Sequence, residues 1–353
     1  MPGIRRAMQI VEFGQPLVLR CDPVPSPQGT EVLLKVRSTG VCHTDLHLQE
    51  GYYDLGSGNR FSMAERGMCL PHTPGHEIVG EVVALGPDAA GVELGDKRVV
   101  YPWIGCGRCA NCKDGVELLC TSSQALGTRR SGGFTDYILI DHPRYLVSFG
   151  DLSPDLACTY ACSGITAYSA LLKARRTTRS LRRLLVIGAG GVGLAAVAIA
   201  KATLDAEITV TDLDDRKLDA AATIGADRVV KVEPASQDID SSLSGMDAVI
   251  DFVGSGSTFR TGVDALDLGG SMVVVGLFGG DVRFSVATLP IKLATLQGSY
   301  VGTLEEFNEL MALARTGAIR PLPHMRMDLE QANEALSKLR SGSVVGRIVL
   351  NPG

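Results

Sequence analysis

The sequence LLVIGAGGVGL occupies residues 184–194. It places Gly188, Gly190 and Gly193 in a G-x-G-x-x-G pattern that follows an apolar strand and opens an Ala-rich helix. The first glycine permits a tight turn, the second lets the backbone approach a pyrophosphate, and the third allows the helix to pack closely on the strand. Free N–H groups at the helix N-terminus attract the same anion. The segment therefore predicts a dinucleotide-binding βαβ unit.

An acidic residue at the end of the next apolar segment supports this interpretation. Asp212 lies 19 residues beyond Gly193, where a carboxylate accepts hydrogen bonds from both hydroxyls of an adenosine ribose and repels a 2′-phosphate. The combination favours NAD over NADP. Lys217 could add a contact to the same ribose, although an exposed lysine on a helix explains it equally well.

The pattern of apolar residues before this segment differs from the pattern after it. From about residue 184 onward, apolar strands alternate with Ala-rich stretches of helical length, which is typical of a parallel sheet with crossover helices. Six strands are expected, at residues 184–187, 207–211, 228–232, 247–252, 271–275 and 295–300. Two helices, at 304–314 and 329–339, and a strand at 347–350 should follow. The first 150 residues instead contain short β-branched runs broken by Gly and Pro, which predicts a β-rich domain.

The composition limits the possible partners and the location. The 353 residues, 45% of them hydrophobic, suffice for two domains, and a net charge of −5 gives no broad basic surface for nucleic acid or anionic lipid. We expect no membrane span, because Lys201 ends the longest apolar run at residues 192–200, and no secretory signal, because Glu12 interrupts the apolar residues behind Arg5 and Arg6. The protein is expected in the cytoplasm. Thiols stay reduced there, so the nine cysteines suggest metal ligands or buried apolar residues rather than disulfides.

Four cysteines form a compact cluster in the Gly-rich stretch GCGRCANCKDGVELLC. They are Cys106, Cys109, Cys112 and Cys120, in the spacing C-x2-C-x2-C-x7-C. Such short gaps let the thiolates converge on one tetrahedral ion, and four sulfur ligands leave no open position for a substrate. The stretch therefore predicts a structural zinc site. An iron–sulfur cluster and a reduced loop without metal are the alternatives, whereas the acidic balance argues against a nucleic-acid zinc ribbon.

Two further segments hold candidate metal ligands beside carboxylates. They are GVCHTDLH at residues 40–47 and PGHEIVG at residues 74–80. Cys42 and His76 are about 34 positions apart, so only folding would join them, and a catalytic zinc needs a third protein ligand. Cys162, in YACSGITAY, is the best candidate. Each of these residues is ambiguous alone, because cysteines are often buried and a lone histidine is usually no ligand. His72, outside the Gly-His-Glu motif, is expected to be a loop residue.

Taken together, the motifs resemble the medium-chain zinc alcohol dehydrogenases, most closely their tetrameric bacterial and archaeal members. The resemblance covers nearly the whole chain in order. It rests on GVCHTDLH, GHEIVG, the four cysteines, CSGIT, GAGGVG with Asp212, VVVGL, GSYVG and the VGR at 345–347. It implies an α/β protein in two domains. Residues 1–163 and 301–353 would form a β-rich GroES-like catalytic domain with the structural zinc lobe, and residues 164–300 a Rossmann NAD-binding domain with a doubly wound parallel sheet of six strands.

The resemblance also assigns roles around a catalytic zinc. It implies that Cys42, His76 and Cys162 bind the metal, with Glu77 just behind them and Asp45 hydrogen-bonded to the His76 ring. Thr44 would accept the proton that the alcohol releases, and His47 would pass it to solvent. For the cofactor, His43 and Arg347 match pyrophosphate contacts, and the residues expected around the nicotinamide are Thr166, Val192, Val275 and Leu277.

These roles imply an NAD-dependent alcohol dehydrogenase with two zinc ions per chain, one catalytic and one structural. The enzyme would interconvert primary or secondary alcohols with aldehydes or ketones as a homotetramer, with a dimer as the alternative. Alternatives are a zinc-independent quinone or enoyl reductase on the same fold, a relative acting on a specialised hydroxyl substrate such as a cyclic hydroxyacyl thioester, and a dinucleotide-sensing or scaffold protein without turnover. Retention of Cys42, His76 and Cys162 argues against the reductase.

The substrate is the least certain part. Trp103, the single tryptophan, matches a position that often lines the substrate pocket, although core packing explains it nearly as well. An apolar or aromatic alcohol of medium size is expected. Residues 51–71 form a longer connection than compact members of the family have, and the sequence does not assign it a role.

Overall fold

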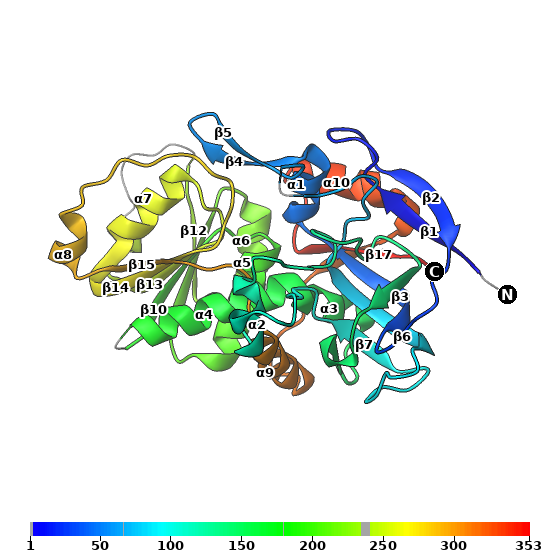
Figure 1. The fold of residues 1–353 in the computed structure, drawn as a ribbon. Coiled ribbons are helices and arrows are strands. Elements are labelled where there is room, and N and C mark those ends of the chain that lie inside the picture. The colour runs from blue at the N-terminus through cyan, green and yellow to red at the C-terminus, as the bar shows by residue number, and fades with distance from the viewer. Residues whose placement is uncertain (1–2, 66, 179, 234–240) are drawn as a thin grey trace.

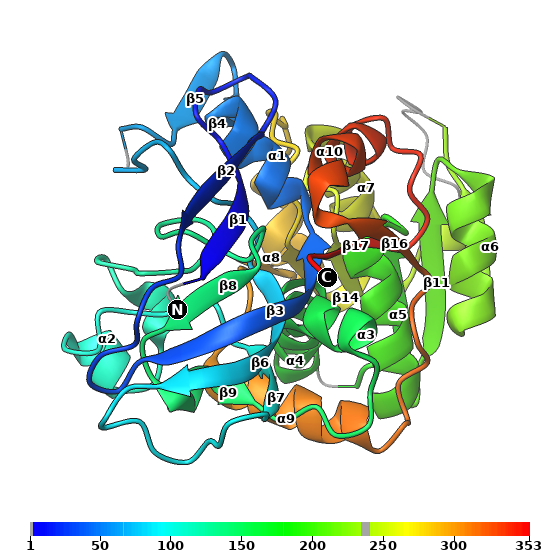
Figure 2. The same cartoon turned by 90° about the vertical axis from the view of Figure 1, so that its right-hand side faces the viewer.

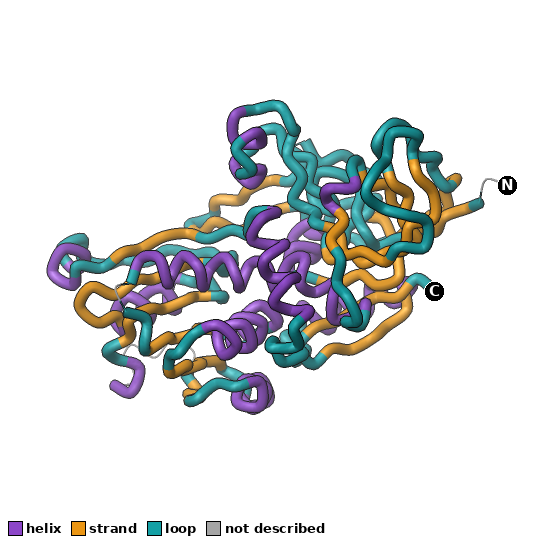
Figure 3. Tube along the Cα trace, turned by 90° about the horizontal axis from the view of Figure 1, so that it is seen from below, coloured by secondary structure: helices purple, strands orange, loops and turns teal. Residues whose placement is uncertain are grey.

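Two β-sheets with helices around them form the two halves of the molecule (Figure 1). The structure is a computed structural model that describes residues 3–65, 67–178, 180–233 and 241–353. Seen from below, helices fill the middle of the molecule between the strands of its two ends (Figure 3). In these ranges, none of the helices combines the length and the apolar character needed to cross a bilayer.

The first half contains six parallel strands in the order β12-β11-β10-β13-β14-β15. Their bounds are β10 (Arg183–Ile187), β11 (Glu207–Asp212), β12 (Arg228–Lys231), β13 (Met246–Asp251), β14 (Leu266–Val274) and β15 (Thr295–Gly298). The sequence-based prediction of a doubly wound, six-stranded parallel sheet is confirmed. Two boundaries differ by more than one residue: β14 starts five residues earlier than the expected residue 271, and β15 ends two residues before residue 300. The order of the strands reverses between β10 and β13, which creates a crevice at their carboxyl ends.

Alternation along β10 explains why both faces of this sheet are covered. Leu184 and Val186 belong to the core cluster that includes α4 (Ile165–Thr177), α5 (Gly191–Thr203) and α6 (Asp215–Ile224). Leu185 and Ile187 point to the other face and join the cluster that includes α7 (Gly256–Ala265). Successive side chains of a strand point to opposite faces, so an apolar run such as this one needs a layer of helices on each side. A short helix, α8 (Thr288–Lys292), lies before β15.

The second half is built on a sheet of seven strands in the order β16-β17-β3-β6-β7-β9, with β8 paired to β3. The bounds are β3 (Val32–Val41), β6 (Glu77–Leu85), β7 (Lys97–Val100), β8 (Tyr137–Ile140), β9 (Leu146–Val147), β16 (His324–Asp328) and β17 (Arg347–Asn351). The last strand, β17, pairs antiparallel with β3. Blue N-terminal strands and red C-terminal elements therefore lie in the same half (Figure 2).

Smaller elements surround this sheet. Two hairpins are formed by β1 (Ile4–Gln9) with β2 (Val18–Pro23) and by β4 (Tyr52–Gly56) with β5 (Asn59–Ser62). The helices are α1 (His43–Glu50), α2 (Ala110–Lys113), α3 (Pro154–Thr159), α9 (Leu304–Arg315) and α10 (Ala332–Arg340). The expected helix at 304–314 is α9, and its start is fixed by a capping box in which Thr303 and Glu306 bond each other's backbone N–H groups. A π-helical turn, Tyr160–Gly164, connects α3 to α4.

The connection 51–71, of which position 66 lies outside the described residues, contains the β4–β5 hairpin. The tip of this hairpin contacts the other half of the molecule, where a Cβ added to Gly56 would lie 2.8 Å from the backbone of Gly280. The hydroxyl of Ser57 bonds the carboxylate of Asp281 beside it. The hairpin therefore crosses from the β-rich half to the loop after β14.

The glycine loop predicts unequal effects on stability for two similar substitutions. A Cβ on Gly193 would lie 1.8 Å from the carbonyl oxygen of Gly188, whereas a Cβ on Gly190 would meet nothing within 4 Å. We expect Gly193→Ala to lower the free energy of unfolding by about 1–3 kcal/mol, because the strand and the helix must move apart. Gly190→Ala, the matched control, should change it by less than about 1 kcal/mol. Chemical denaturation of both variants measures this difference, and equal stabilities would contradict the packing described here.

Candidate active site

A cavity of about 650 Å³ lies at the carboxyl ends of the parallel strands and is closed on its other side by α1 and the π-helical turn. Its position at the crevice between β10 and β13 is where doubly wound sheets bind nucleotides. The residues expected to contact the cofactor all line it: His43, Thr166, Gly188, Gly190, Val192, Gly193, Asp212, Lys217, Val275, Leu277 and Arg347.

The glycine loop and Asp212 are fixed to each other. Gly188 has a φ of 93°, a conformation that favours glycine, and the next residue, Ala189, donates its N–H to the Asp212 carboxylate at 2.7 Å. The same carboxylate accepts N–H groups from Leu213 and Asp214. These three bonds hold an acidic group at the cavity wall next to the loop that would cradle a pyrophosphate.

Three candidate metal ligands from distant segments meet at the other end of the cavity. Cys42 precedes α1, His76 precedes β6, and Cys162 lies in the π-helical turn. One donor atom from each, together with a carboxylate oxygen of Glu77, lies within 4.8 Å of the other donor atoms, and all four residues are buried. The sulfur atoms of Cys42 and Cys162 are 3.9 Å apart. Two thiolates on a tetrahedral zinc lie about 3.8 Å apart, since each Zn–S bond is about 2.3 Å. The donor set therefore fits zinc.

Polar atoms without partners point to the same conclusion. Neither ring nitrogen of His76 has a hydrogen-bond partner, although both are buried, and a buried polar atom is costly unless something binds it. Hydrogen bonding from Cys162 is the largest cause that lowers the pKa of the Cys42 thiol well below its usual value. A thiol that ionises readily and an unpartnered imidazole are the forms that bind a metal.

Asp45 supports this cluster from behind. Its carboxylate is fully buried and accepts the N–H groups of Cys42 at 2.9 Å and Gly75 at 3.0 Å. The distance from Asp45 Oδ1 to His76 Nδ1 is 3.6 Å, which is a charge contact and longer than a hydrogen bond. Burial lowers the pKa of His76, but the charge of Asp45 and the neighbouring Cys42 more than offset it and raise the pKa well above its usual value.

Arg347 connects the metal ligands to the glycine loop. Its guanidinium forms a buried ion pair with Glu77, and its aliphatic part lies against Gly191, where a Cβ would come within 2.5 Å of Arg347 Cδ. Burial raises the pKa of Glu77 to about 7, although the charge of Arg347 opposes that shift. Because β17 carries this arginine, the C-terminal strand completes the site.

Thr44 and His47 both line the cavity from α1. The His47 ring lies 4.6 Å from the ring of Tyr53, and its Nδ1 is 3.9 Å from the carboxylate of Glu50. Burial lowers the pKa of His47 below its usual 6.5, so the imidazole is neutral at pH 7 despite the charge of Glu50. Sequence reasoning did not find Tyr53, which belongs to the β4–β5 hairpin.

Aromatic side chains form the wall beside the metal ligands. Trp103 is buried, lines the cavity, and donates its indole N–H to the carbonyl of Ala161 at 3.1 Å. Its ring lies 5.3 Å from His76 and 5.7 Å from Tyr300. Tyr300 and Phe278 also line the cavity and were missed. Their positions directly after GS and GL, where strands end, could have indicated them.

The four-cysteine lobe lies outside this cavity. The donor atoms of its four cysteines are within 4.8 Å of one another, with Cys112 Sγ at 3.4 Å from Cys109 and 4.0 Å from Cys106. Backbone N–H groups of Arg108 and Cys109 lower the pKa of Cys106 to about 6. This donor set also fits a tetrahedral zinc. His72 is in neither cluster, and its Nε2 contacts the carbonyl of Gly127 at 3.0 Å.

Comparisons with known proteins agree with this geometry. A model for the alcohol dehydrogenase GroES-like domain matches residues 28–151, and one for zinc-binding dehydrogenases matches residues 191–316. A relative from Sulfurisphaera tokodaii named NAD-dependent alcohol dehydrogenase is 39% identical over 98% of this chain and all of its own length. The chain belongs to the medium-chain zinc alcohol dehydrogenase family. The expected GroES-like half and Rossmann sheet are thereby confirmed.

Solved structures of this family show the same fold. The alcohol dehydrogenase of Aeropyrum pernix superposes with a TM-score of 0.87 at 30% identity and covers 98% of this chain and all of its own. The D-arabinose dehydrogenase of Sulfolobus solfataricus superposes with a TM-score of 0.82 at 27% identity, over 99% of this chain and all of its own. The family thus includes members that are named for different substrates, an alcohol in one case and D-arabinose in the other.

The buried Arg347–Glu77 pair predicts a large loss of stability when one partner is removed. We expect Arg347→Gln to lower the free energy of unfolding by about 3–5 kcal/mol, because Glu77 would remain buried without its cation. Arg340→Gln breaks an exposed pair with Glu50 at 3.4 Å and serves as the control, with an expected loss below about 1 kcal/mol. Denaturant titration compares them, and similar losses for both variants would contradict the central position of Arg347.

Proposed function

We propose that this protein is an NAD-dependent alcohol dehydrogenase that reversibly converts alcohols to aldehydes or ketones. The observation that carries the proposal is the convergence of Cys42, His76 and Cys162 at one end of a cavity whose other end contains the dinucleotide loop. The names of the relatives from Sulfurisphaera tokodaii and Saccharolobus solfataricus, at 39% and 38% identity, support the same activity.

The proposed metal sites follow the donor sets. Cys42, His76 and Cys162 would hold a catalytic zinc and leave one position for the substrate, and the four lobe cysteines would hold a structural zinc, giving two ions per chain. Bound zinc supplies Lewis acidity that lowers the pKa of an alcohol, and bound NAD accepts the hydride. Asp45 orients His76, and Glu77 with Arg347 balances charge behind the ligands.

The proposed proton path uses side chains of α1. The Thr44 hydroxyl would receive the proton of the alcohol, and His47, which is neutral above its lowered pKa, would accept it and release it to solvent, while the ribose of a bound cofactor would supply a hydroxyl between the two side chains. On the cofactor side, we propose that Asp212 and Lys217 bind the adenosine ribose and that His43 and Arg347 contact the pyrophosphate. Thr166, Val192, Val275 and Leu277 would surround the nicotinamide ring and hold it near the metal site.

We propose an apolar or aromatic alcohol of medium size as the substrate. Trp103 and Tyr300 give the cavity an aromatic wall beside the metal ligands, and Leu277 and Phe278 extend its apolar surface. Broad apolar walls select substrates by shape and burial rather than by hydrogen bonding. A sugar would need several polar partners at this end of the cavity.

The domain limits, the oligomeric state and the cellular location of the protein are also proposed. We propose a catalytic domain of residues 1–163 and 301–353 and a cofactor domain of residues 164–300, in agreement with the two sheets. A homotetramer, or a dimer, is supported by the exposed apolar side chains of Val286, Ile291 and Leu293 near the edge strand β15. The cytoplasm is the proposed location, where the thiol ligands stay reduced.

Zinc content and turnover test the proposed function together. We expect NADH formation across a panel of alcohols and two zinc ions per chain for the parent, and about one zinc with almost no turnover for Cys42→Ser. Cys21→Ser, which changes an exposed cysteine, is the control and should behave as the parent. A parent that oxidises alcohols with the lobe metal alone, or one that oxidises none of the panel, would overturn the proposal.

The pH dependence of His47→Gln tests the proton path. The neutral imidazole accepts a proton above its pKa, so parental alcohol oxidation should decline as the pH falls through that value, below 6.5. Without the imidazole we expect kcat to drop about tenfold or more near pH 7 and to recover partly at higher pH, where hydroxide accepts the proton. His324→Gln, in the exposed strand β16, is the control. Parallel pH profiles for parent and variant would rule out this role.

A further inference from the structure

One short segment connects the four-cysteine lobe to the cavity. We call residues 101–106, which run from the end of β7 into the lobe, the connecting segment. It contains Trp103, which faces the cavity, and ends at Cys106, the first cysteine of the lobe. Only three positions separate the indole from a candidate ligand of the structural metal.

Trp103 contacts two of the three segments that bring the candidate catalytic ligands. Its ring lies 5.3 Å from the ring of His76, and its indole N–H bonds the carbonyl of Ala161, the residue before Cys162. Tyr300, whose ring lies 5.7 Å from that of Trp103, forms the adjoining part of the cavity wall. A shift of the connecting segment would therefore change the room beside the metal ligands.

Backbone hydrogen bonds hold the base of the lobe to this segment. The N–H groups of Gln124 and Leu126, which follow the lobe, bond the carbonyls of Ile104 at 2.8 Å and Pro102 at 2.9 Å. At the start of the segment, Tyr101 donates its backbone N–H to the carbonyl of Tyr145. Its hydroxyl donates to the carbonyl of Gly302, two residues after Tyr300. The segment is thus held at both ends by backbone hydrogen bonds, and the N–H groups of Gly105 and Cys106 bond side chains of the lobe.

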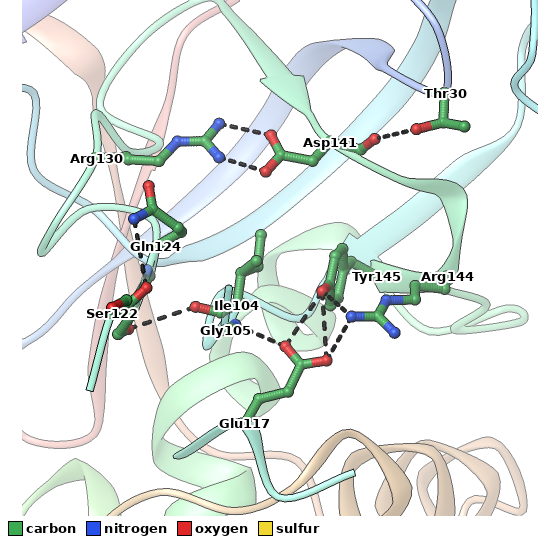
Figure 4. A network of polar contacts seen from close by, with 12 residues as sticks. Thr30, Ile104, Gly105, Glu117, Ser122, Gln124, Arg130, Asp141, Arg144 and Tyr145 are labelled. Atoms are coloured by element: carbon green, nitrogen blue, oxygen red, sulfur yellow. Dashed lines mark hydrogen bonds and ion pairs between the residues drawn. The ribbon is translucent and has the colours of Figure 1, made fainter. Parts of the chain in front are cut away.

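Glu117 of the lobe binds the segment where it enters the lobe (Figure 4). Its side chain is only 5% exposed and accepts the Gly105 N–H at 2.7 Å, while Arg144 binds the other carboxylate oxygen at 2.6 Å. The hydroxyl of Tyr145 lies 3.2 and 3.3 Å from the two oxygens. A carboxylate this buried is stable only while such partners remain, so the contact with Gly105 is firmly specified.

Gly105 also lies against the cysteine cluster. A Cβ there would lie 2.4 Å from the sulfur of Cys112 and 3.1 Å from the Cβ of Glu117, and the next residue, Cys106, donates its N–H to the sulfur of Cys120 at 3.3 Å. Gly105 is therefore packed against both Glu117 and the sulfur atoms. Its position depends on both, and it is two residues from Trp103.

We propose that Glu117 is a positioning residue that couples the four-cysteine lobe to the substrate end of the cavity. By fixing Gly105 against the lobe, it holds the indole of Trp103 in place and so sets the size of the alcohol that fits beside the catalytic ligands. The inference deepens the proposed function and rests on it for its kinetic part. Its structural part, the link from Glu117 to Trp103, does not depend on turnover.

The chain has a single tryptophan, so its fluorescence reports on Trp103 alone. In Glu117→Gln, one amide oxygen replaces two charged acceptors, and either the Gly105 N–H or Arg144 loses its partner. We expect the emission of the zinc-loaded variant to shift to longer wavelength and to be quenched more strongly by acrylamide. The KM for an aromatic alcohol should rise by about tenfold, while the kcat for ethanol stays within about twofold of the parent.

Glu81→Gln is the matched control, because Glu81 forms an ion pair with Arg37 at 2.8 Å on β6, outside the connecting segment. It should leave emission and both KM values unchanged. If Glu117→Gln fails to fold, Tyr145→Phe gives a second test, because it deletes only the hydroxyl that contacts Glu117 and should cause the same changes in weaker form.

Zinc per chain is measured for every variant. The proposal is overturned if Glu117→Gln emits as the parent does, if the KM values for aromatic and small alcohols change by the same factor, or if emission changes only when the lobe metal is lost. A parent that oxidises no alcohol would contradict the proposed function instead, and the emission of the variants would still decide the coupling.

Discussion

The site depends on placing two sulfur atoms and an imidazole together at the buried end of the cavity. Cys42, His76 and Cys162 come from the end of β3, the start of β6 and a π-helical turn, and each of these positions is fixed by a different part of the fold. Both imidazole nitrogens are buried without hydrogen-bond partners, an arrangement that is costly unless something binds them. The proposed metal would supply that partner, and its binding free energy would then stabilise the fold as well.

How much the sequence could predict follows from the distance over which each signal acts. The glycine loop and the four cysteines are local patterns, because 11 and 15 consecutive residues contain all that their chemistry requires. The Cys42, His76 and Cys162 set spans 120 residues and was identified only through resemblance to a family. Tyr53, Phe278 and Tyr300 were not predicted. Phe278 and Tyr300 meet the site through His43 and Trp103, which are distant in the chain. Tyr53 is only six residues from His47, but it reaches that ring through a hairpin whose position the sequence does not show. The boundaries of β14 and β15 were also missed, because an apolar run does not mark where its hydrogen bonding begins or stops.

The return of the chain to the second half, where β3 lies, has a chemical reason as well as a topological one. β17 pairs with β3, and so brings Arg347 between Glu77 of one half and Gly191 of the other. A buried carboxylate next to two thiol ligands would be poorly tolerated by itself, and the guanidinium supplies the compensating charge. The last strand therefore contributes to the charge balance of the metal ligands and to the shape of the nucleotide end at once.

The β4–β5 hairpin gives the two halves a further contact. Its tip meets the loop after β14 through a close backbone approach at Gly56 and Gly280, so the halves touch here as well as beside the glycine loop. A Cβ at Gly56 would lie 2.8 Å from the backbone of Gly280, whereas one at Gly280 would meet only the nitrogen of Gly256, at 3.8 Å. The two glycines are therefore not equivalent: bulk at Gly56 would push the hairpin away from the loop, while at Gly280, whose φ is 103°, the cost of a side chain lies in the backbone conformation.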